Sequence, residues 1–320
     1  MKFGIYGRFM EDLYMPESSV RVSIALPVYN GEQYIKEALD SILNQTYKNF
    51  ELIISDNAST DGTEAICREY AAKDARIRYF RQDENIGSGP NFHFAWEQSE
   101  GEYFKWSAHD DVIAPKFLET CIDALDKNPD AVLCYPRVKV IDKDSKYVED
   151  HDIETQTRDE NPIKRFSSLM LAKGHRCNEV FGLIRQSELI HTEGIGNYAV
   201  SDRILLAQLA LRGPFYEHPD RLFYNRRHMG QFSHTIKTQH QSTVWWDTTQ
   251  IGKIVFPEWR AFNGYRRSLN NSPVGFLDKC LGRLYLLQYI RRYRHRMMND
   301  VKVAIMTWWN RRFNKKEKQS

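Results

Sequence analysis

Short apolar runs that end in polar residues, with helical stretches between them, constrain the fold of this 320-residue chain most strongly. The runs occupy residues 20–27, 50–55, 77–80 and 103–108. The stretch from Tyr34 to Leu43, after the first run, has apolar residues three or four positions apart, which is typical of a helix. Strands and helices that alternate over short links predict an α/β fold with a Rossmann-like, mostly parallel sheet flanked by helices.

Two adjacent carboxylates, Asp110 and Asp111, follow the apolar run at 103–108. Right-handed crossovers bring the loops after parallel strands to one edge of the sheet, so we expect Asp56 and Asp110 to be neighbours there. Adjacent carboxylates repel each other, and a divalent cation such as Mg2+ or Mn2+ is the usual way to stabilise them. A solvated Asp-Asp turn before a helix at Pro115 explains the same pair equally well.

The composition is that of an ordinary folded protein. Hydrophobic residues make up 42% of the chain and aromatic residues 13%, which is enough for a large core. The five cysteines are scattered and form no metal-binding pair, so we expect reduced, mostly buried thiols, as in a cytosolic protein. We expect neither a signal peptide in residues 1–19 nor an apolar run long enough to span a bilayer.

Further elements are expected after the acid pair. The patterns predict a helix from Pro115, a strand at 131–135, an amphipathic helix at 204–211 and a strand at 222–224. Polar residues dominate 142–161 and 229–245. We interpret the first of these stretches as a mobile surface excursion and the second as a loop.

Five short motifs occur in an order and spacing that together resemble one known family. They are Leu26-Pro27-Val28-Tyr29-Asn30-Gly31, the loop from Asp56 to Thr63, Asn85-Ile86-Gly87, His109-Asp110-Asp111 and Ser201-Asp202. Over roughly residues 20–230 the chain resembles the inverting family 2 glycosyltransferases, which have the GT-A fold. The resemblance implies transfer of a sugar from a nucleotide donor to an acceptor hydroxyl, with inversion at the anomeric carbon.

The resemblance also implies roles for single residues. Residues 27–29 would line the nucleotide base and ribose, Glu32 would accept from the ribose, and Asp56 would accept from the base. Asp202 matches the general base that deprotonates the acceptor hydroxyl. Together with arginines whose chemistry suits phosphates, the expected donor-binding residues are Pro27, Val28, Tyr29, Glu32, Asp56, Asn85, Asp110, Arg226 and Arg227.

The metal site departs from the family pattern. Many members carry an acid two residues before the position of Asp110, where this chain has Ala108. The predicted ligands of Mn2+ or Mg2+ are therefore Asp110, Asp111 and His228. The missing acid motivates a second hypothesis, a nucleotide-sugar-binding protein that lacks transferase activity.

Several of these residues also have a purely structural interpretation. Asp202 suits the N-cap of the helix expected from Ile204, and Asp56 suits an Asx turn. Arg226 and Arg227 can equally be the solvated end of a strand. The order of the motifs, rather than any single position, favours the catalytic interpretation.

The expected organisation has three parts. Residues 1–19 form a leader, residues 20–235 a GT-A catalytic domain, and residues 236–320 a basic helical extension. Within the catalytic domain, residues 20–111 form the nucleotide-binding half and residues 112–235 the acceptor-binding half.

The extension concentrates positive charge, because only Asp300 and Glu317 oppose the lysines and arginines from Arg283 onward. A solvated helix, a nucleic-acid patch and a membrane-surface helix all fit this pattern. We favour peripheral contact with the inner face of the cell membrane, since aromatic and aliphatic residues lie among the basic ones. The rest of the chain is net acidic, which argues against a nucleic-acid partner. The expected partners are a UDP-sugar and a saccharide or lipid-linked acceptor, in cytoplasmic synthesis of a cell-surface polysaccharide or glycan.

Overall fold

The computed structural model describes residues 20–152, 154–231 and 239–313. The predicted leader at 1–19 and the last residues of the tail lie outside the described residues. The predicted domain boundary at 235 also falls in an undescribed stretch, 232–238.

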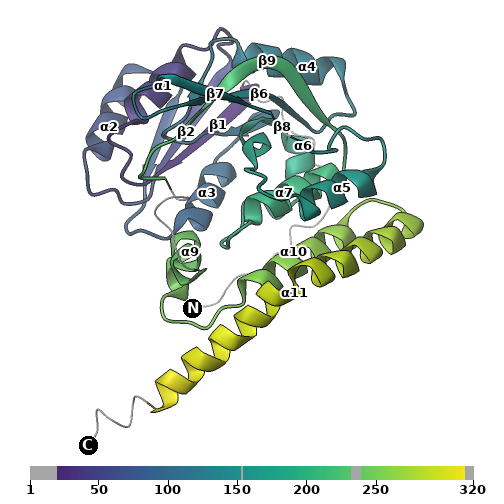
Figure 1. Cartoon of the computed structure of the whole chain (residues 1–320). Coiled ribbons are helices and arrows are strands. Elements are labelled where there is room, and N and C mark those ends of the chain that lie inside the picture. The colour runs from purple at the N-terminus through teal and green to yellow at the C-terminus, as the bar shows by residue number, and fades with distance from the viewer. Residues whose placement is uncertain (1–19, 153, 232–238, 314–320) are drawn as a thin grey trace, which may run out of the picture.

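The N-terminal part alternates strands and helices, as the sequence predicts (Figure 1). Its elements are, in chain order, β1 (Val22–Val28), α1 (Ile35–Leu43), β2 (Phe50–Asp56), α2 (Thr63–Lys73), β3 (Ile77–Arg81), α3 (Ser88–Glu97) and β4 (Tyr103–Trp106). Strands β1 and β2 are buried along their whole length, because helices cover both faces of the sheet.

The middle part adds shorter strands and more helices. Its elements are β5 (Val112–Ile113), α4 (Phe117–Lys127), β6 (Leu133–Ile141), β7 (Tyr147–His151), α5 (Pro162–Leu171), η1 (Asn178–Phe181), β8 (Leu183–Arg185), α6 (Gln186–Leu189), α7 (Ser201–Ala210) and β9 (Phe215–Arg226). The C-terminal part consists of α9 (Gln239–Trp246), η2 (Thr248–Gln250), α10 (Pro257–Asn271) and α11 (Phe276–Phe313).

One mixed sheet runs through the described residues in the order β3-β2-β1-β4-β8-β6-β9-β5, and β7 pairs with β6. Strands β3, β2, β1 and β4 are mutually parallel, and so are β6 and β9. Strands β5, β7 and β8 join antiparallel. The expected parallel sheet is therefore present from β1 to β4, and antiparallel strands extend it.

The strand order reverses at β1, which lies between β2 and β4. The chain moves outward from β1 to β2 and β3, and then returns to the opposite side of β1 with β4. In open α/β sheets, ligands bind in the crevice that such a reversal leaves at the carboxyl ends of the strands. The fold thus points to the ends of β1 and β4, where Tyr29 and the acid pair follow.

Hydrophobic clusters fill both faces of the sheet. Helices α1, α2 and α4 pack on one face, and α3, α5 and α7 on the other. Helices α10 and α11 form a further layer beyond α5 and α7 (Figure 1). Buried residues of this layer, including Tyr265, Leu269, Leu286 and Tyr289, belong to the same cluster as α5 and α7. The C-terminal helices are therefore part of the main core.

Three expectations about single segments were wrong. The stretch 142–161, expected as a mobile excursion, contains β7, which pairs with β6 over Val138–Ile141. Strands β6 and β9 are much longer than the expected 131–135 and 222–224, because they pair with each other along their length. The stretch 229–245, expected as a loop, includes most of α9.

The expectations for the cysteines and for membrane spans are met within the described residues. All five cysteines are free thiols, and only Cys280 is partly exposed. None of the helices that the structure describes is both long and apolar enough to cross a bilayer.

Candidate active site

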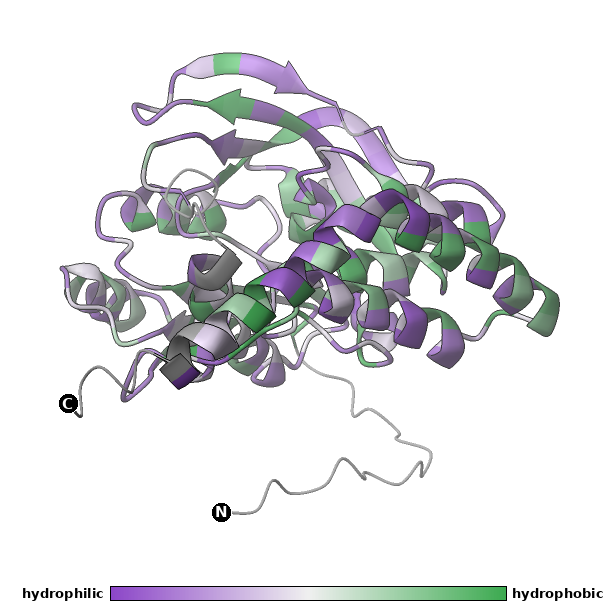
Figure 2. Cartoon of the chain, turned by 60° about the horizontal axis from the view of Figure 1, so that its bottom comes forward, coloured by the Kyte–Doolittle hydropathy of each residue, from purple (hydrophilic) through white to green (hydrophobic). Residues whose placement is uncertain are grey.

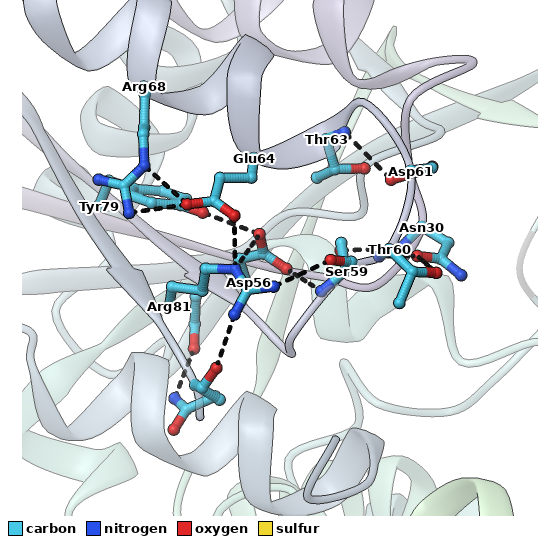
Figure 3. A network of polar contacts seen from close by, with 12 residues as sticks. Asn30, Asp56, Ser59, Thr60, Asp61, Thr63, Glu64, Arg68, Tyr79 and Arg81 are labelled. Atoms are coloured by element: carbon cyan, nitrogen blue, oxygen red, sulfur yellow. Dashed lines mark hydrogen bonds and ion pairs between the residues drawn. The ribbon is translucent and has the colours of Figure 1, made fainter. Parts of the chain in front are cut away.

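The loops that follow β1 and β2 are joined to each other by hydrogen bonds (Figure 3). Asn30 Oδ1 accepts from the backbone N–H of Thr60 at 2.8 Å, and Gly31 N donates to Thr63 Oγ1 at 2.8 Å. Asn30 has φ 52°, a left-handed conformation that asparagine tolerates. Each such bond contributes about 1 kcal/mol, so the two loops form one preorganised rim.

The predicted donor-binding residues at the end of β1 differ in how exposed they are and in what they contact. Pro27 and Val28 are buried within β1, whereas the side chain of Tyr29 is 42% exposed. Glu32 Oε2 accepts from Gly62 N at 2.8 Å, so its carboxylate joins the loop after β2. Tyr29 is therefore the member of this group that presents an open face to a ligand.

Asp56 ends β2 with a fully buried carboxylate. Its Oδ1 accepts from Ser59 N and its Oδ2 from the Tyr79 hydroxyl, each at 2.8 Å, and Arg81 Nε lies 4.0 Å away (Figure 3). Burial and the hydrogen bond with Asp56 raise the pKa of Tyr79. These contacts give Asp56 the structural role that an Asx-type turn implies. Its contact with a nucleotide base stays a prediction.

Asn85 lies in the loop between β3 and α3. Its Oδ1 accepts from Asn57 Nδ2 at 3.0 Å and from Gly87 N at 2.9 Å. Gly87 has φ 93°, and a Cβ there would lie 2.9 Å from the carbonyl oxygen of Trp246. Only glycine fits that position, and its small size lets the loop between β3 and α3 pack closely against α9.

The acid pair and the end of β9 meet beyond β4. Asp110 Oδ2 lies 3.0 Å from His228 Nε2. Asp111 Oδ1 accepts from Arg226 N at 2.9 Å and from Asn225 Nδ2 at 3.1 Å. The two carboxylates thus have different partners. Asp110 contacts the imidazole of His228, and Asp111 accepts hydrogen bonds from β9.

These environments move the two pKa values in opposite directions. Burial acts to raise the pKa of Asp110, but its hydrogen bond with His228 and the nearby charges of His109 and His228 outweigh burial and lower it. Burial and the charge of Asp110 raise the pKa of Asp111 well above its usual range, although hydrogen bonds from β9 oppose them. Asp110 is therefore the member of the pair that carries negative charge most readily.

The predicted three-residue metal site is not assembled in the part of the chain that the structure describes. No group of three or more His, Cys, Asp or Glu side chains there has a metal-binding arrangement. Asp110 and His228 lie together, but Asp111 is bound to β9. The residues present fit a metal only as a two-residue set that a diphosphate and water would complete, as is common for Mg2+.

Arg226 is fully buried, with 1% of its side chain exposed. Its Nε donates to the Asp110 carbonyl oxygen at 2.8 Å, its Nη1 to Ser145 Oγ at 2.8 Å, and its Nη2 to Glu37 Oε2 at 2.5 Å. Its guanidinium also lies over the ring of Tyr34. Arg226 joins α1, the acid pair and the β6–β7 turn, which favours a structural role over the predicted phosphate contact.

Arg227 has a more open environment. Its Nη1 pairs with Glu149 Oε1 at 2.5 Å, a carboxylate that is itself half exposed. Its Nε is buried and has no hydrogen-bond partner among the residues that the structure describes. Arg226 is the last residue of β9 and Arg227 lies just beyond it. Arg227 is thus the arginine of the pair that retains a donor for a ligand.

Asp202 lies in the first turn of α7, which begins at Ser201. The residue at the N-cap is Val200, so the alternative in which Asp202 caps the helix is not what the structure shows. Val200 has φ 64°, a strained conformation for a β-branched residue. Asp202 is partly exposed, and its Oδ1 accepts from Arg203 N at 2.7 Å. Strained backbone is common at functional sites, and here it lies two residues before the candidate base Asp202.

A cavity of about 160 Å³ lies beside the start of α7. Val200 and Arg203 line it from the catalytic side, and Tyr265, Tyr289 and Tyr293 line it from α10 and α11. The C-terminal helices therefore contribute to the surroundings of Asp202.

Sequence reasoning missed residues that support the acid pair from elsewhere. The ring centroid of Tyr34 lies 4.7 Å from that of His228. Asn225 and Glu37 hold Asp111 and Arg226, as described above. Asn225 could have been found from the sequence, because it directly precedes the two arginines. Glu37 could not, because its contact with Arg226 spans 189 positions.

Comparison with solved structures identifies the fold. The chain superposes on TarS of Staphylococcus aureus in complex with UDP-GlcNAc with a TM-score of 0.64 and 16% identity, covering 90% of this chain and 81% of that one. A mannosyltransferase of Pyrobaculum calidifontis in complex with GDP-Man and Mn2+ gives a TM-score of 0.50 and 15% identity, over 93% and 89% of the two chains. The fold is the GT-A fold that the sequence predicts.

The sequence comparisons identify the family. The model of glycosyl transferase family 2 matches residues 23–187, just over half of the chain. An uncharacterized glycosyltransferase of Rickettsia conorii is 33% identical over 242 residues, which is 71% of this chain and 37% of the relative. One of Rickettsia typhi is 44% identical over 126 residues, 39% of this chain and 38% of the relative. The chain belongs to glycosyl transferase family 2, and it matches little more than a third of the length of these relatives.

Proposed function

We propose that the protein is an inverting glycosyltransferase that moves a sugar from a nucleotide-sugar, with UDP as the nucleotide, to an acceptor hydroxyl. The observation that carries the proposal is the meeting of the acid pair, the joined loops of β1 and β2 and the end of β9 at the strand-order reversal. Membership of glycosyl transferase family 2 supports the reaction class. The relatives bound to UDP-GlcNAc and GDP-Man support a nucleotide-sugar donor.

In this proposal the donor lies across the carboxyl ends of β1 and β4. Tyr29 stacks on the base, with Pro27 and Val28 beneath it, while Glu32, Asp56 and Asn85 hold the loops that surround the base and ribose. Arg227, whose side chain is more exposed than that of Arg226, donates to the diphosphate. Arg226 keeps this surface in place rather than touching the phosphates.

Asp202 acts as the general base. Its carboxylate is partly exposed and lies in the first turn of α7. It takes the proton of the acceptor hydroxyl while the oxygen attacks the anomeric carbon from the side opposite the leaving diphosphate. A single displacement of this kind inverts the configuration and needs no second enzymic nucleophile.

Asp110 and His228 are the residues that would hold Mn2+ or Mg2+, with Asp111 behind them. When bound, the metal would neutralise charge on the leaving diphosphate. The solved relative that contains Mn2+ supports this cofactor. Asp111 is hydrogen-bonded to β9 and so fixes the orientation of the acid pair. Its effect on the metal is indirect, through Asp110.

The proposed acceptor is a saccharide or a lipid-linked saccharide used to build a cell-surface polysaccharide or glycan. The proposed location is the cytoplasm, at the inner face of the cell membrane. The cavity beside Val200 and Arg203 supports an acceptor site that includes the C-terminal helices.

The decisive experiment compares the wild type with Asp202→Asn. UDP release from a panel of UDP-sugars is measured with water or added saccharides as acceptor, and UDP binding is measured by calorimetry with Mn2+ or with EDTA. We expect Asp202→Asn to bind UDP as the wild type does and to lose transfer at least about 100-fold. Asp123→Asn, at an exposed position of α4, is the matched control and should keep full activity.

Full turnover by Asp202→Asn would contradict the assignment of the base. Metal-dependent UDP binding without turnover on any donor and acceptor would instead favour the nucleotide-sugar-binding protein. The departure at Ala108 and the incomplete metal set motivate that alternative.

A further inference from the structure

Helix α11 exposes large side chains along the side that faces away from the core. Its inward side is marked by Leu286, Tyr289, Met297 and Ala304, which are buried at spacings of three, eight and seven residues. A second series begins opposite this side and consists of Leu277, Leu284, Arg291, Met298, Ile305 and Arg312, each seven residues after the last. We call this series the outer face of α11. Positions seven apart drift by about 20° around a helix, so the series forms one stripe that turns by about 100° over its length.

The apolar members of the outer face are strongly exposed. Leu277 is 81% exposed, Leu284 61%, Met298 59% and Ile305 52%. An exposed apolar stripe of this length is unusual on a folded protein and indicates a surface that another body covers. The helix has 38 residues and is therefore roughly 57 Å long.

The charge of the same helix is almost all positive. It carries nine Lys and Arg residues against Asp278 and Asp300. Asp300 is buried and accepts from Glu258 N at 2.7 Å, so it does not reach the outer face. Figure 2 shows hydrophilic and hydrophobic residues alternating along α11 at the front of the molecule.

The position of the helix leaves the stripe accessible. The C-terminal end of α11 projects beyond the rest of the described fold (Figure 1). Among the described side chains of α11 after Ala304, none is buried. The outer face therefore lies on a rim of the molecule rather than in a groove.

Charge decides which partner suits this surface. A second copy of the chain would place Arg291 and its basic neighbours against like charges, which opposes self-association. A bilayer with anionic headgroups offers phosphates to the arginines and an apolar boundary to the leucine, methionine and isoleucine side chains. The series includes Leu277 and Leu284, which lie well before the basic tail, so the whole helix takes part.

We propose that the outer face of α11 binds an anionic lipid surface and lies in the plane of the headgroups along its full length. This inference goes beyond the proposed transfer reaction and does not depend on it. It would orient the fold on the membrane and bring a lipid-linked acceptor within reach of the side that carries α7.

The test is co-sedimentation of the full chain with phosphatidylcholine vesicles that either contain or lack phosphatidylglycerol. We expect binding only to the anionic vesicles, falling as salt is raised. Arg291→Glu with Lys302→Glu should weaken this binding at least about tenfold. Leu284→Ser with Ile305→Ser should weaken it as well, because the apolar contact is lost. Lys36→Glu with Lys127→Glu, exposed on α1 and α4, is the matched charge control and should bind as the wild type does.

Equal binding by the α11 variants and the control would overturn the proposal, as would failure of the wild type to bind anionic vesicles. A dimer in light scattering that Leu284→Ser with Ile305→Ser abolishes would also overturn it, because the face would then be an interface between copies. UDP release in the absence of vesicles is measured on the same samples. Loss of vesicle binding with unchanged UDP release separates this inference from the proposed reaction.

Discussion

At the scale of single residues, the buried amine of Lys105 has the clearest consequence for how stability depends on pH. The side chain is fully buried in β4, and its Nζ donates to the carbonyl oxygens of Trp106 and Phe181. Burial lowers its pKa to about 7. In the unfolded chain a lysine keeps a pKa of about 10.4, so above pH 7 the unfolded state binds more protons than the folded state. The free energy of unfolding therefore rises with pH through this range.

Lys105→Met removes that dependence. Between pH 7 and pH 9.5 the wild type should gain about 3 kcal/mol of unfolding free energy relative to the variant. Urea unfolding of both proteins at the two pH values measures the difference. Lys36→Met, at an exposed position, is the control and should follow the wild type. Parallel changes in the wild type and Lys105→Met would show that Lys105 does not titrate in this window.

At the scale of elements, the end of β9 holds separate parts of the site together. Arg226 connects β9 to α1, to the acid pair and to the β6–β7 turn. Arg227, the next residue, pairs with a half-exposed glutamate. The pair offers a natural comparison, because the same residue type has one buried and one more open environment.

Arg226→Met should lower the free energy of unfolding by about 2–4 kcal/mol, because it removes the hydrogen bonds by which a buried guanidinium joins α1, the acid pair and the β6–β7 turn. Arg227→Met should lower it by less than about 1 kcal/mol, since an exposed ion pair contributes little, but should weaken UDP binding roughly tenfold. Denaturant unfolding and calorimetry on both variants check this. Weakened UDP binding by a fully stable Arg226→Met would restore the phosphate role that the sequence predicts.

The first four strands and their loops could be predicted from sequence, because each is a local apolar run that ends in polar residues. The different roles of Arg226 and Arg227 were not predicted, because they depend on contacts with Glu37 and Glu149, which lie far away in the sequence. Strand β7 was missed for a related reason. Its residues are mostly exposed, and pairing with β6 makes them a strand.

At the scale of the whole molecule, the helices expected in the C-terminal part are present, and their packing into the main core was not predicted. The composition of residues 236–320 suggested an appended basic extension, and nothing local revealed that it completes the core. Tyr265 and Leu269 of α10 pack in the same cluster as Leu205 of α7, and Leu286 and Tyr289 of α11 close that cluster. Such contacts join segments far apart in sequence, so periodicity alone does not show them.

This packing predicts different results for two truncations. A chain that ends at residue 275 loses the burial of Leu286, Tyr289 and Met297, each contributing about 1.5–3 kcal/mol. The sum is comparable to the whole stability of a typical domain, so this chain should fail to fold cooperatively. A chain that ends at Thr307 keeps every buried residue of α11 that the structure describes, and its melting temperature should fall by no more than about 4 °C. Circular dichroism melting of both chains makes the comparison. Cooperative folding of the shorter chain would mean that the extension is dispensable to the core.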